Sequence, residues 1–269
     1  MKFGCCAPIR YYYVIKETGF DFIECSGREI AALTEEEFRQ WEMVINQGGI
    51  PCLAINDYCS EELVIAGPGF DIGKTREYAE LICERGSRLG VKLIGVGAPA
   101  SRKLPEGFDQ ELAEKQAQAF VTETCTIAQK YGITVMWEAC NKCVTNFHTK
   151  IHEVVAFVED LNIDNLKLVI DFYHLSAEGE ELTVIEDALP YTVHLHVAMG
   201  DDKGRKNFLT EDGYSYHKEI ISTINAHGYN GTISIEPHPN ITEREITENG
   251  LKSLNMLRSI EREVKNGIS

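Results

Sequence analysis

The sequence predicts a single (β/α)₈ barrel that spans residues 1–269. Short β-branched runs alternate with longer amphipathic stretches about eight times along the chain, which is the order of elements in parallel α/β folds. The apolar runs are nearly continuous, as in parallel strands that are covered on both faces. A length of 269 residues is ordinary for one such barrel, and no G-x-G-x-x-G follows the first strand to indicate a dinucleotide-binding sheet.

The first four strand–helix units each consist of an apolar run that leads into an amphipathic stretch. Their strands are expected at Lys2–Ala7, Phe20–Cys25, Ile50–Asn56 and Val91–Gly97. Their helices are expected at Tyr11–Thr18, Glu35–Gln47, Lys74–Leu89 and Gln110–Tyr131. Glycine follows several of these helices directly, as at Gly90 and Gly132, and glycine is the residue that most readily ends a helix in the left-handed conformation.

The second half of the chain repeats the same pattern. Its strands are expected at Ile133–Ala139, Leu166–Asp171, Thr192–Ala198 and Thr232–Glu236. Its helices are expected at His152–Leu161, Val184–Ala188, Tyr216–His227 and about Gly250–Val264. No linker, charge block or low-complexity segment interrupts the series, so one domain is expected.

Composition excludes several classes of function. The hydrophobic fraction of 43% and charged fraction of 25% are those of a globular protein, and a net charge of −16 disfavours nucleic acid as a partner. No run of about 18 apolar residues and no signal-peptide pattern is present, so we expect a cytoplasmic protein without a membrane span. The nine cysteines, several within apolar runs, are expected to be reduced and buried, as at Cys25, Cys52 and Cys140.

Four consecutive strands of the second half carry potential metal ligands near their carboxyl ends. These are Glu138, Asp171, His196 and Glu236. Because parallel barrel strands end at the same face, we expect the four side chains to converge there. Uncompensated carboxylates at that distance repel one another, and a divalent cation removes the conflict. Three carboxylates and one imidazole suit Mn²⁺, the expected ion, with Mg²⁺, Co²⁺ or Zn²⁺ as alternatives.

The remaining histidines are assigned by their context. His194 lies two residues before His196 and therefore on the same face of its strand, one layer deeper, where it is expected to support the site or to pack. His217 and His238 are expected to lie in solvated loops.

This pattern resembles the xylose isomerase-like TIM barrels, and within them the sugar isomerases and epimerases that include the tagatose and psicose 3-epimerases. The resemblance follows the order of elements over the whole chain. It implies that the four strand-end residues bind the metal ion. It also implies that His174, in Asp171-Phe172-Tyr173-His174, and Asn141 contact the substrate.

Two positions differ from the ketohexose 3-epimerases. Those enzymes place a substrate-binding glutamate six residues after the first metal-binding glutamate, where this chain has Val144. They place an arginine six residues after the metal-binding histidine, where this chain has Asp202, and Arg205 is assigned here as the substrate-binding arginine. A polyol, a keto acid or a derivatised sugar therefore stays open as the substrate.

The predicted function is that of a divalent-metal-dependent isomerase or epimerase acting on a small sugar or polyol-like keto substrate. Glu138 and Glu236 come from strands three apart in the circle, so they face a substrate from roughly opposite sides as paired bases. The cation stabilises the enediolate that forms when a C–H proton leaves. The resemblance also implies assembly into dimers or tetramers.

Three alternatives remain. A dehydratase or lyase of the inosose dehydratase type shares the proton abstraction and differs only in the departing group. An endonuclease IV-like DNA repair enzyme would need further histidines after the third and fourth strands, where this chain has Asn56-Asp57 and Gly97-Ala98-Pro99. A binding protein without activity is the third alternative.

Overall fold

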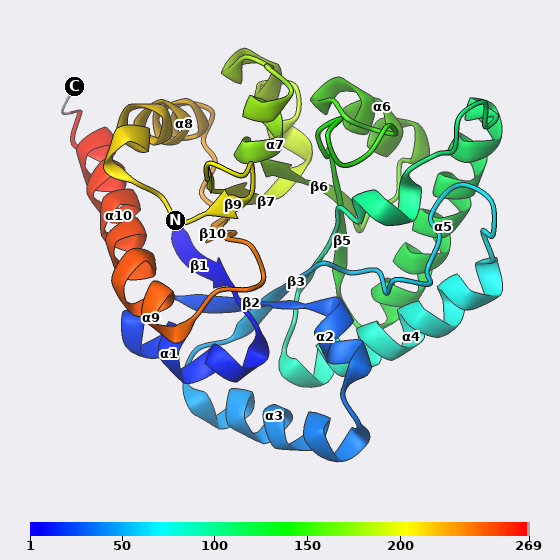
Figure 1. Cartoon of the computed structure of the whole chain (residues 1–269), viewed down its shortest axis with the longest axis horizontal. Coiled ribbons are helices and arrows are strands. Elements are labelled where there is room, and N and C mark those ends of the chain that lie inside the picture. The colour runs from blue at the N-terminus through cyan, green and yellow to red at the C-terminus, as the bar shows by residue number, and fades with distance from the viewer. Residues whose placement is uncertain (268–269) are drawn as a thin grey trace.

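Eight parallel strands close into a barrel, which confirms the predicted fold class (Figure 1). The computed structural model describes residues 1–267. Around the barrel the strands follow the order β1-β10-β7-β6-β5-β4-β3-β2. Their bounds are β1 Lys2–Cys6, β2 Phe22–Ser26, β3 Cys52–Asn56, β4 Leu93–Val96, β5 Thr134–Glu138, β6 Leu166–Asp171, β7 Thr192–Val197 and β10 Thr232–Ile235. Two further short strands, β8 Met199–Gly200 and β9 Lys206–Asn207, pair with each other as an antiparallel hairpin.

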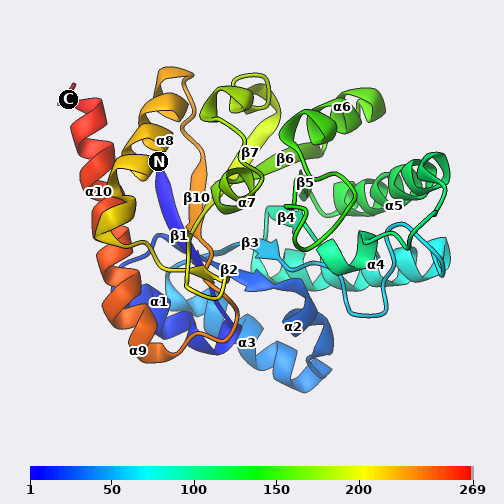
Figure 2. The ribbon, with the colours of Figure 1, turned by 45° about the horizontal axis from the view of Figure 1, so that its top comes forward.

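Helices surround the barrel on its outer side, as the two views of Figures 1 and 2 show. Their bounds are α1 Tyr12–Thr18, α2 Gly27–Ala32, α3 Glu35–Gly48, α4 Ile72–Leu89, α5 Gln110–Lys130, α6 Ile151–Leu161, α7 Phe172–Ala177, α8 Tyr214–Ala226, α9 Glu243–Glu245 and α10 Leu251–Lys265. Side-chain caps begin several of them: Thr34 and Glu37 form a capping box at α3, and Asp71 and Asp109 cap α4 and α5. None of the described helices is long and apolar enough to cross a membrane.

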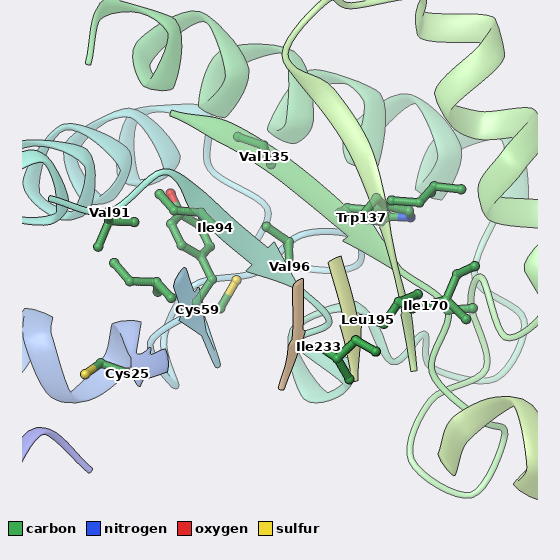
Figure 3. Close-up of a cluster of buried hydrophobic side chains, with 14 of the residues drawn as sticks. Cys25, Cys59, Val91, Ile94, Val96, Val135, Trp137, Ile170, Leu195 and Ile233 are labelled. Carbon is green, nitrogen blue, oxygen red and sulfur yellow. The ribbon is translucent and has the colours of Figure 1, made fainter. Parts of the chain in front are cut away.

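The main hydrophobic core includes the outward-facing strand residues, which pack against the helices. Figure 3 shows part of it, with Val135 and Trp137 on β5, Leu195 on β7 and Ile233 on β10. The Trp137 ring stacks on Phe157 of α6 with a centroid separation of 5.0 Å. Alternate residues of the same strands point into the barrel, so the apolar outer row fixes which side chains reach its interior. The predicted burial of the cysteines is confirmed for Cys25, Cys52 and Cys140, but Cys143 is exposed.

Local structure differs from the prediction in four places. Helix α2 and helix α7 were not predicted, and neither was the β8–β9 hairpin. The helix predicted at Val184–Ala188 is wrong, because the chain there forms two 3₁₀ turns, Leu182–Ile185 and Leu189–Tyr191. Helix α7 instead begins directly after β6, because the Asp171 carboxylate accepts hydrogen bonds from the backbone N–H groups of Tyr173 and His174.

Candidate metal centre

The structure brings Glu138, Asp171, His196 and Glu236 together at one end of the barrel. Each offers one ligand atom, and these four atoms all lie within 4.8 Å of one another. The register of the strands produces this convergence, because Asp171 is paired with His196 across β6 and β7. Glu138 closes β5, and Glu236 directly follows β10.

Two buried atoms of this cluster are poorly satisfied by the residues that the structure describes. Oε1 of Glu138 has no hydrogen-bond partner, and Nδ1 of His196 lies 3.0 Å from Oε2 of Glu236 without a well-aligned hydrogen bond. A buried polar atom without a partner destabilises the fold unless something outside the chain satisfies it. Carboxylate oxygens and imidazole nitrogens are among the ligand atoms that divalent cations bind. The donor set therefore fits a metal ion.

Glu24 of β2 contacts His196 through the ring nitrogen that does not face the other candidate ligands. It has no exposed surface, and its two carboxylate oxygens lie 3.1 Å from Nε2 of His196 and 2.9 Å from Nε2 of His194. The other ring nitrogen of His194 lies 2.6 Å from the hydroxyl of Thr232. His194 therefore lies one layer below His196, as its two-residue spacing predicts. Because Glu24 contacts Nε2 of His196, the Nδ1 atom faces the cluster.

The end of β4 leaves room for the Glu138 carboxylate. Gly97 stands beside this side chain, and a Cβ atom at Gly97 would overlap Oε2 of Glu138. At Gly95, two residues earlier, an added Cβ would meet its nearest neighbour at 3.5 Å, an ordinary contact. Gly97 thus clears the space into which Glu138 projects.

Lys206 of β9 supplies a positive charge to the cluster. Its ammonium group donates hydrogen bonds to Oδ2 of Asp171 and, at 2.5 Å, to Oε2 of Glu236. The second oxygen of Glu236 accepts from the side-chain amide of Asn56 at 3.3 Å. Asp171 is likewise shared, since its Oδ1 caps α7 while its Oδ2 faces Lys206. An ammonium group therefore sits beside two of the four candidate metal ligands.

These charges shift the protonation of the cluster. Burial raises the pKa of Glu138 to about 7, although the nearby Lys206 ammonium acts in the opposite direction. Burial also disfavours the ionised form of Glu236, but Lys206 and His196 outweigh it and hold the pKa of Glu236 well below its usual range. Burial favours neutral His196, yet Glu236 and Glu24 raise its pKa well above normal. A bound cation would take the place of the proton on His196.

His174 and Asn141 form a second buried pair beside the cluster. The backbone N–H and the side-chain amide of Asn141 point at Nδ1 of His174, at 3.3 and 2.7 Å. The amide oxygen of Asn141 accepts from the backbone N–H of Cys143, so its nitrogen faces the ring. Nδ1 of His174 is therefore an acceptor, and its Nε2, 3.9 Å from Glu138, carries the proton. Burial, assisted by Lys206, lowers the pKa of His174 well below normal and keeps the ring neutral.

A cavity of about 330 Å³ opens over this group and is of a size that fits a small molecule. Its lining includes Glu138, His174, His196, Lys206 and Glu236 from the second half of the chain, and Pro8, Ser26, Arg28, Asn56 and Pro99 from the first.

Comparison with known families agrees with this geometry. The sequence profile of the xylose isomerase-like TIM barrels matches residues 12–260, which is most of the chain. This chain belongs to the xylose isomerase-like TIM barrel family.

Curated relatives of this xylose isomerase-like barrel include ketose epimerases. The chain is 26% identical over 237 residues to the D-psicose 3-epimerase of Ruminiclostridium cellulolyticum, covering 84% of this chain and 77% of that enzyme. It is 25% identical over 227 residues to the L-ribulose 3-epimerase of Mesorhizobium japonicum, covering 82% and 72%. A solved D-tagatose 3-epimerase-like protein superposes on it with a TM-score of 0.81 at 19% identity, covering 100% of both chains, which shows a common fold.

The residues assigned to substrate binding in this xylose isomerase-like barrel take different positions. His174 lines the cavity, and the side-chain amide of Asn141 contacts Nδ1 of its ring. The structure does not bring Arg205 to the cavity: its guanidinium is half-exposed and pairs with Asp201 at 2.7 Å. The two positions that differ from the ketohexose 3-epimerases, Val144 and Asp202, are both exposed.

Two site residues were missed from the sequence, Glu24 and Lys206. A charged residue inside the apolar strand Phe22–Ser26 was a usable signal for Glu24, because a buried carboxylate requires a partner. Lys206 follows Arg205 in a polar segment and had no such signal. The expectation that His217 lies in a solvated loop is wrong, since it belongs to α8 and is 1% exposed.

Proposed function

We propose that this protein is a divalent-metal-dependent isomerase or epimerase of a small keto sugar or polyol, with Mn²⁺ as the expected ion. The observation that carries the proposal is the cluster of four ligand atoms within 4.8 Å of one another: three of the four residues line the cavity, and Oε1 of Glu138 is buried without a partner. Glu138, Asp171, His196 and Glu236 are the residues that would hold the ion. The relatives named as psicose and ribulose 3-epimerases support the same reaction class.

The ion, when bound, would supply Lewis-acid polarisation of a substrate carbonyl. The protein's own groups then have separate tasks. Glu138 and Glu236 come from the ends of β5 and β10, three strands apart around the barrel, and serve as the bases that take and return the proton of the neighbouring C–H bond.

His174 is assigned to orient the substrate. Its side chain lines the cavity, with Nε2 3.9 Å from Glu138. The neutral ring can donate a hydrogen bond from Nε2–H to a substrate oxygen without adding a charge. Asn141 fixes this ring by contacting Nδ1 at 2.7 Å, so the donor stays directed at the cavity.

The test is a hydrogen-exchange assay. Protein freed of metal with a chelator, then given Mn²⁺, is incubated in D₂O with ketohexoses, ketopentoses and inososes, and NMR follows deuterium at the carbon beside the carbonyl. We expect deuterium incorporation together with an epimer or isomer, and only when the cation is present. Parallel samples with Mg²⁺, Co²⁺ and Zn²⁺ identify the preferred ion.

Two results would decide against the proposal. Absence of solvent deuterium in every substrate, with cation binding shown independently, would remove the assignment as an isomerase or epimerase. A product that has lost water would instead assign the protein to the dehydratases that share this proton abstraction.

A further inference from the structure

The Lys206 ammonium lies within the cluster that the proposed function assigns to a metal ion. It bonds to Asp171 and Glu236, two of the four candidate ligands, and its side chain is only 15% exposed. Its contact with Glu236 uses Oε2, the same oxygen that lies 3.0 Å from Nδ1 of His196. The ammonium thus uses the acceptor atoms that a divalent cation would need.

The three carboxylates of the cluster give the ammonium its position. Burial lowers the pKa of Lys206, but the negative charges of the three carboxylates outweigh it and hold this pKa well above its usual range. A divalent cation would neutralise the same carboxylates. Two cations at this spacing in a buried site repel each other strongly, so they cannot both occupy it.

Hydrogen bonds hold the backbone around Lys206 in place. Its carbonyl accepts from the backbone N–H of His238 at 2.9 Å, and it is paired with Gly200 across the hairpin. The hairpin is held further by the Tyr173 hydroxyl, which donates to the carbonyl of Gly204 at 2.5 Å. The Lys206 side chain lines the cavity, which offers it space outside the cluster. The Tyr173 ring lies 5.9 Å from its ammonium nitrogen and offers the cation a second contact.

We propose that Lys206 is a built-in competitor for the metal ion: its ammonium holds the position between Asp171 and Glu236 and leaves it when a divalent cation binds. This inference rests on the proposed function, because it requires a cation at the same cluster. Lys206 then sets the affinity of the protein for its metal. Once displaced, its ammonium stands at the edge of the cavity.

Calorimetric titration of the chelator-treated protein with Mn²⁺ tests the competition. Lys206→Met keeps an unbranched side chain, one atom shorter, and removes its charge, and Lys203→Met changes an exposed lysine on the same hairpin. We expect Lys206→Met to bind Mn²⁺ about 5–150-fold more tightly than the wild type, the usual range for coupling between two binding events. Lys203→Met should bind as the wild type does.

Amine labelling of the wild-type protein provides a test that does not depend on a variant folding. Peptide mapping should find Lys206 protected from an acylating reagent without Mn²⁺ and modified severalfold faster with saturating Mn²⁺, while Lys203 reacts equally in both. Unchanged labelling of Lys206, or an equal or weaker Mn²⁺ affinity in Lys206→Met, would overturn the competition while leaving the metal site intact. Failure of every variant and of the wild type to bind any divalent cation would overturn the proposed function as well.

Discussion

The Glu24 carboxylate joins two histidines of the same strand, with its oxygens 3.1 Å from Nε2 of His196 and 2.9 Å from Nε2 of His194. An ionised carboxylate only accepts hydrogen bonds, so both rings donate to it from Nε2. The Nδ1 atom of His196 is then the nitrogen that can release its proton and bind a metal ion. Glu24 is therefore a positioning residue, acting on the metal centre through His196.

Replacing Glu24 by Gln should weaken the metal site without removing a ligand. We expect Mn²⁺ affinity to fall by about 10–100-fold, because partners that orient a metal-binding histidine contribute that much. Calorimetry measures the affinity, and ¹⁵N NMR of the histidine rings measures whether the proton leaves Nε2 of His196. Glu29→Gln, on the outer helix α2, is the matched control. An unaltered affinity in a folded Glu24→Gln protein would refute the positioning role.

The two proposed bases can be tested at saturating Mn²⁺. Glu138→Gln and Glu236→Gln should each slow deuterium exchange by about 10²–10⁴-fold, the usual contribution of a general base. Glu111→Gln, which replaces an exposed residue of α5, should leave the rate unchanged. The D₂O assay gives the rates, and full activity in either variant with metal bound would remove that residue from the proton transfer.

Gly97 gives a test of the space around Glu138. Gly97→Ala should push the Glu138 carboxylate out of place, which lowers Mn²⁺ affinity and destabilises the fold by about 1–3 kcal/mol, as overpacking does. Gly95→Ala is the control, since its added Cβ has only an ordinary contact. Mn²⁺ titration and urea unfolding measure the two effects. Equal behaviour of the two variants would mean that the close approach at Gly97 does not govern the carboxylate.

His217 predicts a pH dependence of stability that is separate from the site. Burial lowers its pKa, although the hydrogen bond to the carbonyl of Gly213 acts the other way. The unfolded chain therefore binds a proton, at a pKa of about 6.5, that the folded protein resists. The stability that the neutral His217 ring contributes is complete above that pH. It is lost as the pH falls through the lowered pKa of His217 in the folded protein.

The variant His217→Asn keeps a side-chain donor for the Gly213 carbonyl and removes the titration. Urea unfolding at pH 8 and pH 5 should show the wild type losing more stability on acidification than this variant does. His227→Asn, a more exposed position at the end of α8, should follow the wild type. A difference between wild type and His217→Asn that stays constant with pH would contradict the prediction.

The barrel and its four candidate ligands could be predicted because both depend on local pattern. Glu138, Asp171 and Glu236 each follow directly on an apolar run, and His196 lies near the end of one. Parallel strands carry such residues to one face whatever the rest of the chain does. The same reasoning placed His194 one layer deeper, because the side-chain period of a strand is two residues.

Contacts that depend on barrel closure could not be predicted. Glu24 and His196 are 172 residues apart and meet only because β2 and β7 face each other across the interior. Lys206 depends on a hairpin whose strands have two residues each, too short to show any hydrophobic period. Helix α7 was missed because one residue, Asp171, both ends a strand and caps a helix, leaving no connecting loop to mark the boundary.

The two halves of the chain contribute different kinds of residue to the cavity lining. The four candidate metal ligands come from the second half of the chain, while Pro8, Asp57 and Ala98, which line the cavity, come from loops of the first. Loops tolerate sequence change better than the strands that support them. Substrate preference can therefore drift through evolution, or be redesigned in the laboratory, by exchanging these loops while the proton-transfer machinery is inherited unchanged.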